Sequence, residues 1–511
     1  MGENRRLAVN MFAQFLSFFL SVGINFFLSP YIISKLGRDA YGFMGLANNF
    51  VIYSCLITVA VNSMAGRFIT ISYHEGNIEK ANRYYSSTFF ANVLFSFILL
   101  ILSISSIPFL ENFINIPIEL VDDVKILFYL TFLNTIIGLL GTVWSVSTFV
   151  KNRLDLSSVR AIIGDIIRAI LIVVLFVFWK PHIWYLSLVT LIITMLVVYL
   201  NYRLTSYLTP EFSISKCKCA WKEVKEIAVS GIWNTLSRVS SMLNNGLDLL
   251  ISNLFLGSSM MGIVSISKTI PSMVLSVGGM ICGVFSPQLT QAYARGNMKY
   301  IENELKKSIK ILGVYAILPL SCVYAYGDVF YSLWLPTENA RMLHQLTMIG
   351  VLSYFFSLPM QTLWTIFTVT NRVKETSINL IKWSFLSCII VLICMFFIDS
   401  VSIRLYIIIG VSVLMDAARD LIFLLPRGAT VLGLPQYYFF PILVRNIICT
   451  LFLIGISFLL KYLLLTEYSW SYLIICVFLS GIVALFVSFM GILNKQDRDY
   501  WINMIRCKFY N

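Results

Sequence analysis

Six polar side chains recur along one strongly apolar stretch at the spacing of a single helix face. They follow one another at intervals of three or four residues: Asn234, Arg238, Ser241, Asn245, Asp248 and Ser252. At 3.6 residues per turn, this spacing predicts one polar stripe along a helix. Arginine offers a bidentate fork to phosphate, and Asn and Ser offer hydrogen bonds to hydroxyl groups. The stripe predicts the wall of a hydrated cavity for an anionic ligand, with hydrogen bonds between helices as the alternative.

Other charged side chains also stand inside apolar stretches. Lys268, Arg168 and Lys382 are three such cations. A charge at the bilayer centre costs roughly 2.5–3.5 kcal/mol, so these groups are expected to face water, one another or a ligand. Arg168 follows Asp165 by three residues, which also fits a local ion pair. Lys268 and Lys382 also fit side chains that reach the membrane surface.

Acidic residues in the apolar stretches have two predicted roles. Asp248 and Asp165 are candidate sites for a coupling ion, H+ or Na+. Asp416 and Asp420 flank Arg419, and this cluster is predicted to compensate its own charges.

The composition excludes an ordinary soluble enzyme and a disordered chain. Of 511 residues, 58% are hydrophobic and only 12% are charged, against about 25% charged residues in soluble domains. The net charge of +13 is attributed to cytoplasmic loops rather than to nucleic-acid binding. Ten scattered Cys and three dispersed His suggest no metal site, and no cofactor is expected.

Fourteen stretches are long and apolar enough for membrane helices, and helices are the structure that lipid permits for such runs. The predicted spans are 8–34, 42–66, 84–108, 125–150, 157–179, 183–201, 226–256, 262–286, 307–328, 342–369, 377–398, 402–426, 436–460 and 470–493. With both termini in the cytoplasm, the large majority of Lys and Arg outside the spans lie on the cytoplasmic side, as the positive-inside rule requires. The sequence thus predicts an all-α integral membrane protein without a sizeable soluble domain.

The two halves of the chain align when the sequence is shifted by 220 residues. Gly37 meets Gly257, Gly76 meets Gly296, and Asn25 and Asn48 meet Asn245 and Lys268. The repeat carries six helices and both copies start inside, so a parallel 6 + 6 repeat with two further helices is predicted. The predicted divisions are an N-lobe at 1–201, a cytoplasmic linker at 202–225, a C-lobe at 226–426, two helices at 427–493 and a cytoplasmic tail at 494–511. The predicted cavity set is Arg238, Lys268, Asn245, Asp248, Asn234, Ser241, Asn25, Asn48, Arg168 and Lys382.

Two sequence motifs, one expected on the outer side and one on the cytoplasmic side, are typical of a known family, as is the 6 + 6 + 2 layout. The motifs are LGRDAYG at 36–42 and RFITISYHEGNIEK at 67–80. The chain resembles the Wzx-type O-antigen and polysaccharide flippases of the multidrug/oligosaccharidyl-lipid/polysaccharide (MOP) exporter superfamily.

This resemblance implies a MATE-like two-lobe fold in the bacterial cytoplasmic (inner) membrane. It implies that an oligosaccharide linked through diphosphate to undecaprenol moves from the cytoplasmic to the outer leaflet by alternating access. A cationic lumen would then map to Arg238 and Lys268, and further to Arg168 and Lys382. Other polysaccharide-assembly membrane proteins are the implied partners.

Three alternatives remain open. A multidrug or cation exporter of the same superfamily usually has twelve helices and an acidic cavity, and a lipid II flippase differs only in cargo. A membrane-embedded polysaccharide polymerase or ligase would usually carry a sizeable outer loop, whereas the outer connections here are short. A transporter rather than an enzyme is therefore expected.

Overall fold

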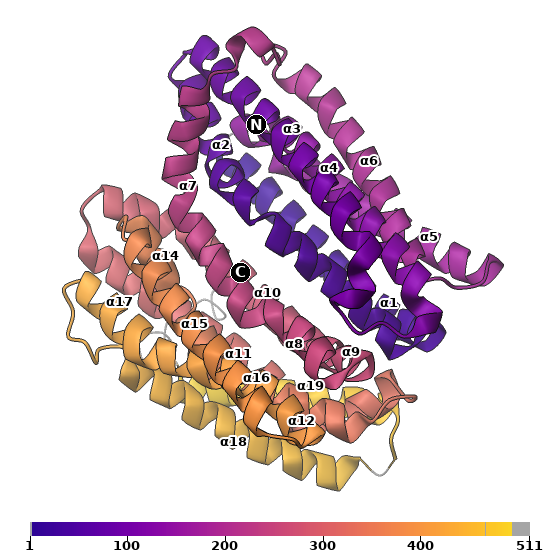
Figure 1. Cartoon of the computed structure of the whole chain (residues 1–511). Coiled ribbons are helices and arrows are strands. Elements are labelled where there is room, and N and C mark those ends of the chain that lie inside the picture. The colour runs from indigo at the N-terminus through magenta and orange to yellow at the C-terminus, as the bar shows by residue number, and fades with distance from the viewer. Residues whose placement is uncertain (1–2, 466, 493–511) are drawn as a thin grey trace. The chain divides into compact units, whose positions relative to one another are not determined.

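The structure is a computed structural model that describes residues 3–465 and 467–492. Within these residues the chain forms helices joined by short connections and has no β-strand (Figure 1). Ten helical segments of this described part are long and apolar enough to cross a membrane. The predicted all-α, multi-pass membrane protein is confirmed. The count of fourteen crossings stays a prediction, because several predicted spans are divided into shorter helices.

The helices group by their contacts into two compact units, Met1–Ser265 and Ile266–Asn511. The first unit holds α1 (Glu3–Ser54), α2 (Leu56–His74), α3 (Ile78–Ser106), α4 (Val121–Val150), α5 (Leu154–Phe178), α6 (Trp184–Leu208), α7 (Trp221–Ser241), α8 (Leu247–Leu256) and most of α9 (Ser258–Ser267). Short 3-10 turns lie at Ile107–Asn112, Ile118–Leu120 and Lys216–Lys218, and a π-turn lies at Met242–Gly246. The predicted boundary between the two lobes, at 225/226, differs from the boundary between these two compact units. It stays a prediction about which helices move together during transport.

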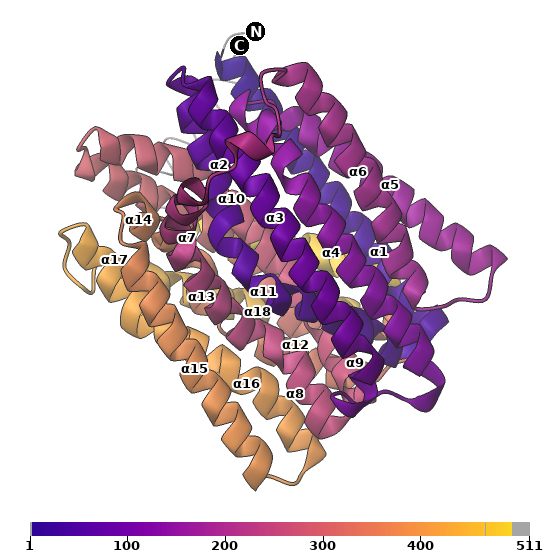
Figure 2. The same cartoon turned by 45° about the horizontal axis from the view of Figure 1, so that its top comes forward.

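In the first unit, α4 and α6 run side by side, and α2 packs against α3, α4 and α7 (Figures 1 and 2). Buried apolar side chains on α2, α3, α4 and α7 form one core, with Ile69, Tyr85, Val143 and Ile227 among them. This core holds the four helices together, so it positions the polar groups on α7.

The second unit is arranged around one long helix. Its elements are α10 (Thr269–Ala294), α11 (Met298–Trp334), α12 (Ala340–Gly350), α13 (Tyr354–Met360), α14 (Leu363–Val369), α15 (Val373–Phe397), α16 (Val401–Arg419), a π-turn (Asp420–Leu424), α17 (Leu425–Val431), α18 (Phe440–Leu464) and α19 (Trp470–Gly491). α11 contacts α10, α12, α13, α18 and α19. The Tyr326 hydroxyl of α11 lies 2.8 Å from Ser480 Oγ of α19, which ties one of the last helices to this centre.

Backbone geometry repeats at the offset found in the sequence. Gly37 (φ 81°, ψ 167°) breaks α1, and Gly257 (φ 88°, ψ 174°) ends α8 in the same conformation. Asn152 (φ 50°) and Asn371 (φ 57°), which are 219 residues apart, are the two residues other than glycine with positive φ in the described chain. Asn77 and Asn297 both cap the next helix, with side chains that accept from the backbone N–H three residues later. The matched sequence positions therefore form matched turns.

Candidate functional site

The predicted polar stripe begins on α7 and is interrupted by the π-turn at Met242–Gly246. A π-turn contains one more residue than an α-turn, so residues beyond it are rotated by about 100° relative to those before it. Arg238 and Ser241, before the π-turn, are exposed. Asp248 and Ser252, after it, are 4% and 0% exposed. The single stripe expected from 3.6-residue spacing is therefore two polar surfaces, one open and one enclosed.

The π-turn is held by side chains from α1. The Gly246 carbonyl oxygen accepts a hydrogen bond from Asn49 Nδ2 at 2.9 Å and a short one from the Tyr53 hydroxyl. An interrupted helix ladder leaves carbonyls that need such donors. Asn48, the predicted site residue beside Asn49, is exposed instead. Asn49 and Tyr53, which make this contact, are not among the predicted site residues, and the cavity role of Asn48 stays a prediction.

Arg168 connects α5 to α1. Its Nη2 atom lies 3.3 Å from Asp165 Oδ1 and donates to Asn25 Oδ1 at 3.0 Å. The Asp165 and Arg168 side chains are only 21% and 25% exposed. The ion pair anticipated from the i,i+3 spacing is confirmed, and Asn25 joins it from α1. The charges of Asp165 and Arg168 cancel each other, and the hydrogen bond from Arg168 to the Asn25 amide links α5 to α1.

Further amide side chains cross-link the helices of the first unit. Asn234 Nδ2 on α7 donates to Ser63 Oγ on α2 at 3.2 Å. Asn62 on α2 and Asn92 on α3 bond reciprocally, each at 3.0 Å. Only Asn234 was singled out from the sequence. The sequence does contain a signal for Asn62 and Asn92. Both are amides inside apolar spans, where an unpaired amide is costly, so each would be expected to bond to another helix.

The second unit contains the remaining predicted cations. Lys268, half-buried, stands at the break between α9 and α10, and Lys382 is exposed on α15. Arg238 and Lys268 belong to different units, and their common cavity stays a prediction. The side chain of Asn245 and the tail at 494–511 lie outside the described residues.

Asp416, Arg419 and Asp420 form a local ion cluster at the start of the second π-turn. Arg419 Nη1 lies 2.6 Å from Asp416 Oδ1, and its Nη2 lies 3.1 Å from Asp420 Oδ1. The guanidinium also lies 5.4 Å from the ring centre of Trp364. The predicted local compensation is confirmed.

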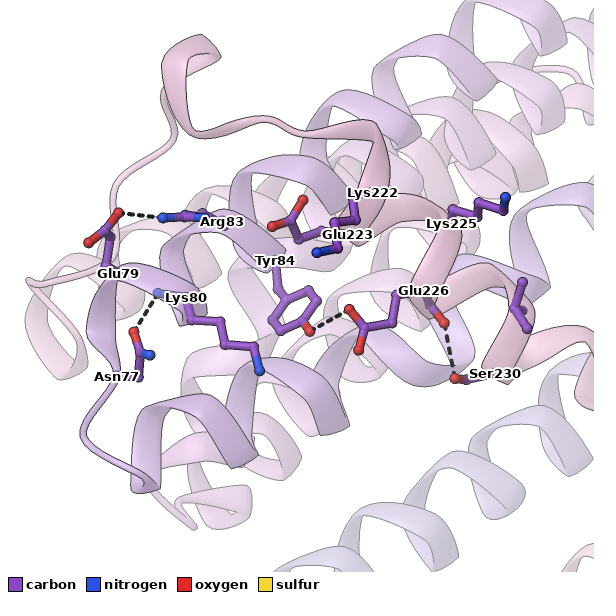
Figure 3. A pocket seen from close by; sticks show the side chains of 11 residues that line it. Asn77, Glu79, Lys80, Arg83, Tyr84, Lys222, Glu223, Lys225, Glu226 and Ser230 are labelled. Carbon is purple, nitrogen blue, oxygen red and sulfur yellow. Dashed lines mark hydrogen bonds and ion pairs between the residues drawn. The ribbon is translucent and has the colours of Figure 1, made fainter.

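A polar pocket of about 770 Å³ lies between the first turns of α3 and α7, within the first unit (Figure 3). The Tyr84 hydroxyl bridges the two helices by donating to Glu226 Oε2 at 2.9 Å. The pocket is lined by Asn77, Glu79, Lys80, Arg83, Tyr84, Lys222, Glu223, Lys225, Glu226, Val229 and Ser230. From the sequence, the basic residues of this lining are expected in cytoplasmic connections, and no pocket is predicted because the two segments are about 140 residues apart.

A second, apolar groove of about 660 Å³ lies on α18 beside the end of α19. It is lined by Tyr437, Phe440, Pro441, Val444, Arg445, Ile448, Cys449 and Gly491. Arg445, which had no assignment from sequence, is its one charged lining residue. Among the residues that the structure describes, no group of three His, Cys, Asp or Glu is arranged to hold a metal ion.

The profile of a family described as "Polysaccharide biosynthesis protein" matches residues 36–330, which is more than half of the chain. The chain belongs to the polysaccharide biosynthesis protein family. The match runs from the break at Gly37 through α11, and so includes the polar groups of the first unit. A relative from Bacillus subtilis (strain 168), "Uncharacterized membrane protein EpsK", is 29% identical over 380 residues, which cover 73% of this chain and 74% of the relative.

Solved structures show which fold this family member has. The lipid II flippase MurJ in an inward closed conformation superposes with a TM-score of 0.66 at 15% identity, covering 94% of this chain and 98% of MurJ. An inward-facing multidrug resistance MATE family transporter of the MOP superfamily superposes with a TM-score of 0.64 at 13% identity, covering 83% and 98%.

The MATE-like fold inferred from the sequence is confirmed. The resemblance drawn from the sequence agrees with the matched family, whose description names polysaccharide biosynthesis, and with the fold shared with MurJ and the MATE transporter.

Proposed function

We propose that this member of the polysaccharide biosynthesis protein family is a flippase for undecaprenyl-diphosphate-linked oligosaccharide, such as an O-antigen or capsule repeat unit. The cargo moves from the cytoplasmic to the outer leaflet of the bacterial inner membrane. Two lobes alternate around a cationic cavity, and both termini lie in the cytoplasm.

Arg238 is the observation that carries this proposal. Its side chain is exposed on α7 and makes no ion pair among the described residues. An arginine side chain is expensive against lipid, so Arg238 is expected to face water or an anionic ligand. Exposed Ser241 and half-buried Asn234 on the same helix would supply hydrogen bonds to sugar hydroxyls. A ligand that carries both a diphosphate and a sugar would match the guanidinium of Arg238 and the hydrogen-bonding groups of Ser241 and Asn234.

The groove on α18 fits the lipid part of such a cargo. Its lining is mainly apolar, and Arg445 is the one cation in it. An isoprenoid chain would gain from burial along this surface, while a phosphate could bind the guanidinium. This role for the groove belongs to the same proposal.

The driving force and the partners are part of the proposal. Asp248, which is enclosed behind the π-turn, and Asp165, which is paired with Arg168, are the candidates for H+ or Na+ coupling. Other polysaccharide-assembly membrane proteins would supply and consume the cargo.

Deletion of the gene in its native host tests the proposal. Polyprenyl-linked glycans are extracted from the deletion strain and identified by mass, and their sidedness is measured. We expect complete repeat units to accumulate on the cytoplasmic side while surface polysaccharide disappears, with both effects reversed by the wild-type gene. Sensitivity to cationic drugs without glycan accumulation would indicate a multidrug exporter. Repeat units accumulating on the outer face would contradict a flippase and indicate a polymerase or ligase.

A further inference from the structure

The pocket between α3 and α7 joins two helix N-termini with an excess of basic side chains (Figure 3). Its lining contains four basic residues, Lys80, Arg83, Lys222 and Lys225, and three acidic ones, Glu79, Glu223 and Glu226. All four basic side chains are exposed. The pocket is therefore open, polar and weakly cationic.

Two of the three acids are already engaged. Arg83 Nη2 lies 2.7 Å from Glu79 Oε1 on its own helix, and Glu226 accepts from Tyr84. Lys222 and Lys225 make no ion pair in the described parts of the chain, and Lys80 Nζ lies 5.8 Å from the ring centre of Tyr84. The ammonium groups of Lys80 and Lys222 lie near Tyr84 and Glu226, whereas Lys225 points away (Figure 3). Lys80 and Lys222 therefore have donors available for an anion.

Glu223 supplies the complementary acceptor. The residue is 9% exposed, and its Oε2 atom is buried without a hydrogen-bond partner among the described residues. A buried carboxylate oxygen left without a donor is costly. The N-cap residue of α7, Ala220, gives no side-chain hydrogen bond to the first turn, so the backbone N–H groups there remain donors for an anion. The pocket thus presents donors for a phosphate beside an acceptor for a hydroxyl.

Apolar neighbours associate the pocket with the membrane surface. Val229 lines it and is 63% exposed, and Trp221 at the start of α7 is 72% exposed. Tryptophan is enriched at the membrane–water interface, and the exposed valine adds apolar surface beside the pocket. A ligand with an attached acyl or isoprenoid chain therefore fits better than a free anion.

We propose that the pocket between α3 and α7 binds the phosphate and a neighbouring hydroxyl of a membrane-lipid headgroup. Lys80 and Lys222 contact the phosphate, and Glu223 accepts from the hydroxyl. The headgroup belongs either to a bulk anionic lipid or to the transported lipid; the second source rests on the proposed function.

The test uses the full-length protein in phosphatidylcholine nanodiscs. Phosphatidylglycerol or an undecaprenyl-diphosphate-linked monosaccharide is added as the probe, since each carries a hydroxyl close to its phosphate, and bound lipid is measured by native mass spectrometry. Lys80→Gln with Lys222→Gln is compared with Lys216→Gln with Lys299→Gln, which removes the same charge outside the pocket lining. We expect roughly tenfold weaker binding of at least one probe by the pocket variant and unchanged binding by the control, since charge-assisted bonds to phosphate are lost.

The two probes distinguish the sources. Tighter binding of the undecaprenyl-diphosphate-linked monosaccharide than of phosphatidylglycerol assigns the pocket to the transported lipid, and equal binding assigns it to bulk anionic lipid. Equal losses in the pocket and control variants, or no loss in either, would overturn the proposal. Because binding is measured without transport, a deletion strain that flips its glycans normally would refute the proposed function and leave the bulk-lipid assignment intact.

Discussion

Gly231 on α7 lies directly against the backbone of Ala60 on α2. A Cβ atom on residue 231 would stand 1.9 Å from the Ala60 carbonyl oxygen, far inside contact distance. The two helices can approach this closely only because residue 231 has no side chain. Both helices lie in the first compact unit, so this contact contributes to the packing of that unit.

Gly231→Ala is expected to lower the stability of the purified protein by about 1–3 kcal/mol, because the added methyl group overpacks the contact. Complementation of the deletion strain should fall sharply. The melting temperature in detergent and surface polysaccharide in cells measure the two effects. Gly66→Ala on α2 is the matched control, since its Cβ would meet nothing within 4 Å. A Gly231→Ala protein as stable as the Gly66→Ala protein would contradict the close contact.

Arg238→Ala is expected to abolish transport with normal membrane insertion, whereas Arg238→Lys should keep part of it. The guanidinium is exposed on α7, and lysine preserves its charge without the bidentate geometry. Surface polysaccharide in the complemented deletion strain is the measurement. Arg295→Ala, which removes an exposed cation at the end of α10, controls for the loss of charge. Wild-type transport by Arg238→Ala would rule out the cavity role.

Asp165→Ala is expected to destabilise the protein more than the double variant Asp165→Ala with Arg168→Ala. The single change leaves a largely buried guanidinium without its carboxylate, and only the 3.0 Å bond to Asn25 remains. For a pair about three-quarters buried, we expect a difference of about 1–3 kcal/mol. A double-mutant cycle on melting temperatures measures it. A double variant less stable than both single variants would argue against the pair as described.

The repeated turns predict that substitution by glycine changes the thermal stability differently at Asn152 and at Asn371. Both residues have positive φ, where glycine is tolerated and a Cβ costs about 1 kcal/mol. Asn371→Gly should therefore be nearly neutral and Asn371→Ala destabilising. Asn152→Gly should also be destabilising, because Asn10 Nδ2 donates to Asn152 Oδ1 at 3.0 Å. Thermal unfolding of the three variants compares them, and an Asn152→Gly protein with wild-type stability would show that this bond contributes little.

Local sequence properties determined much of this protein. Apolar length predicts membrane helices because lipid cannot pair an exposed backbone, and the matched Gly and Asn positions predict repeated turns because few residues adopt positive φ. The i,i+3 pairing of Asp165 with Arg168 follows from helix geometry alone.

The tertiary structure decided the rest. The π-turn at Met242–Gly246 separates Arg238 from Asp248, although regular spacing placed both on one face. That turn depends on donors from Asn49 and Tyr53, nearly 200 residues away. The pocket between α3 and α7 likewise exists only because distant helix ends are packed together. Helix periodicity is encoded by neighbours in the chain, whereas the partners that interrupt a helix or complete a pocket are set by packing over long sequence distances.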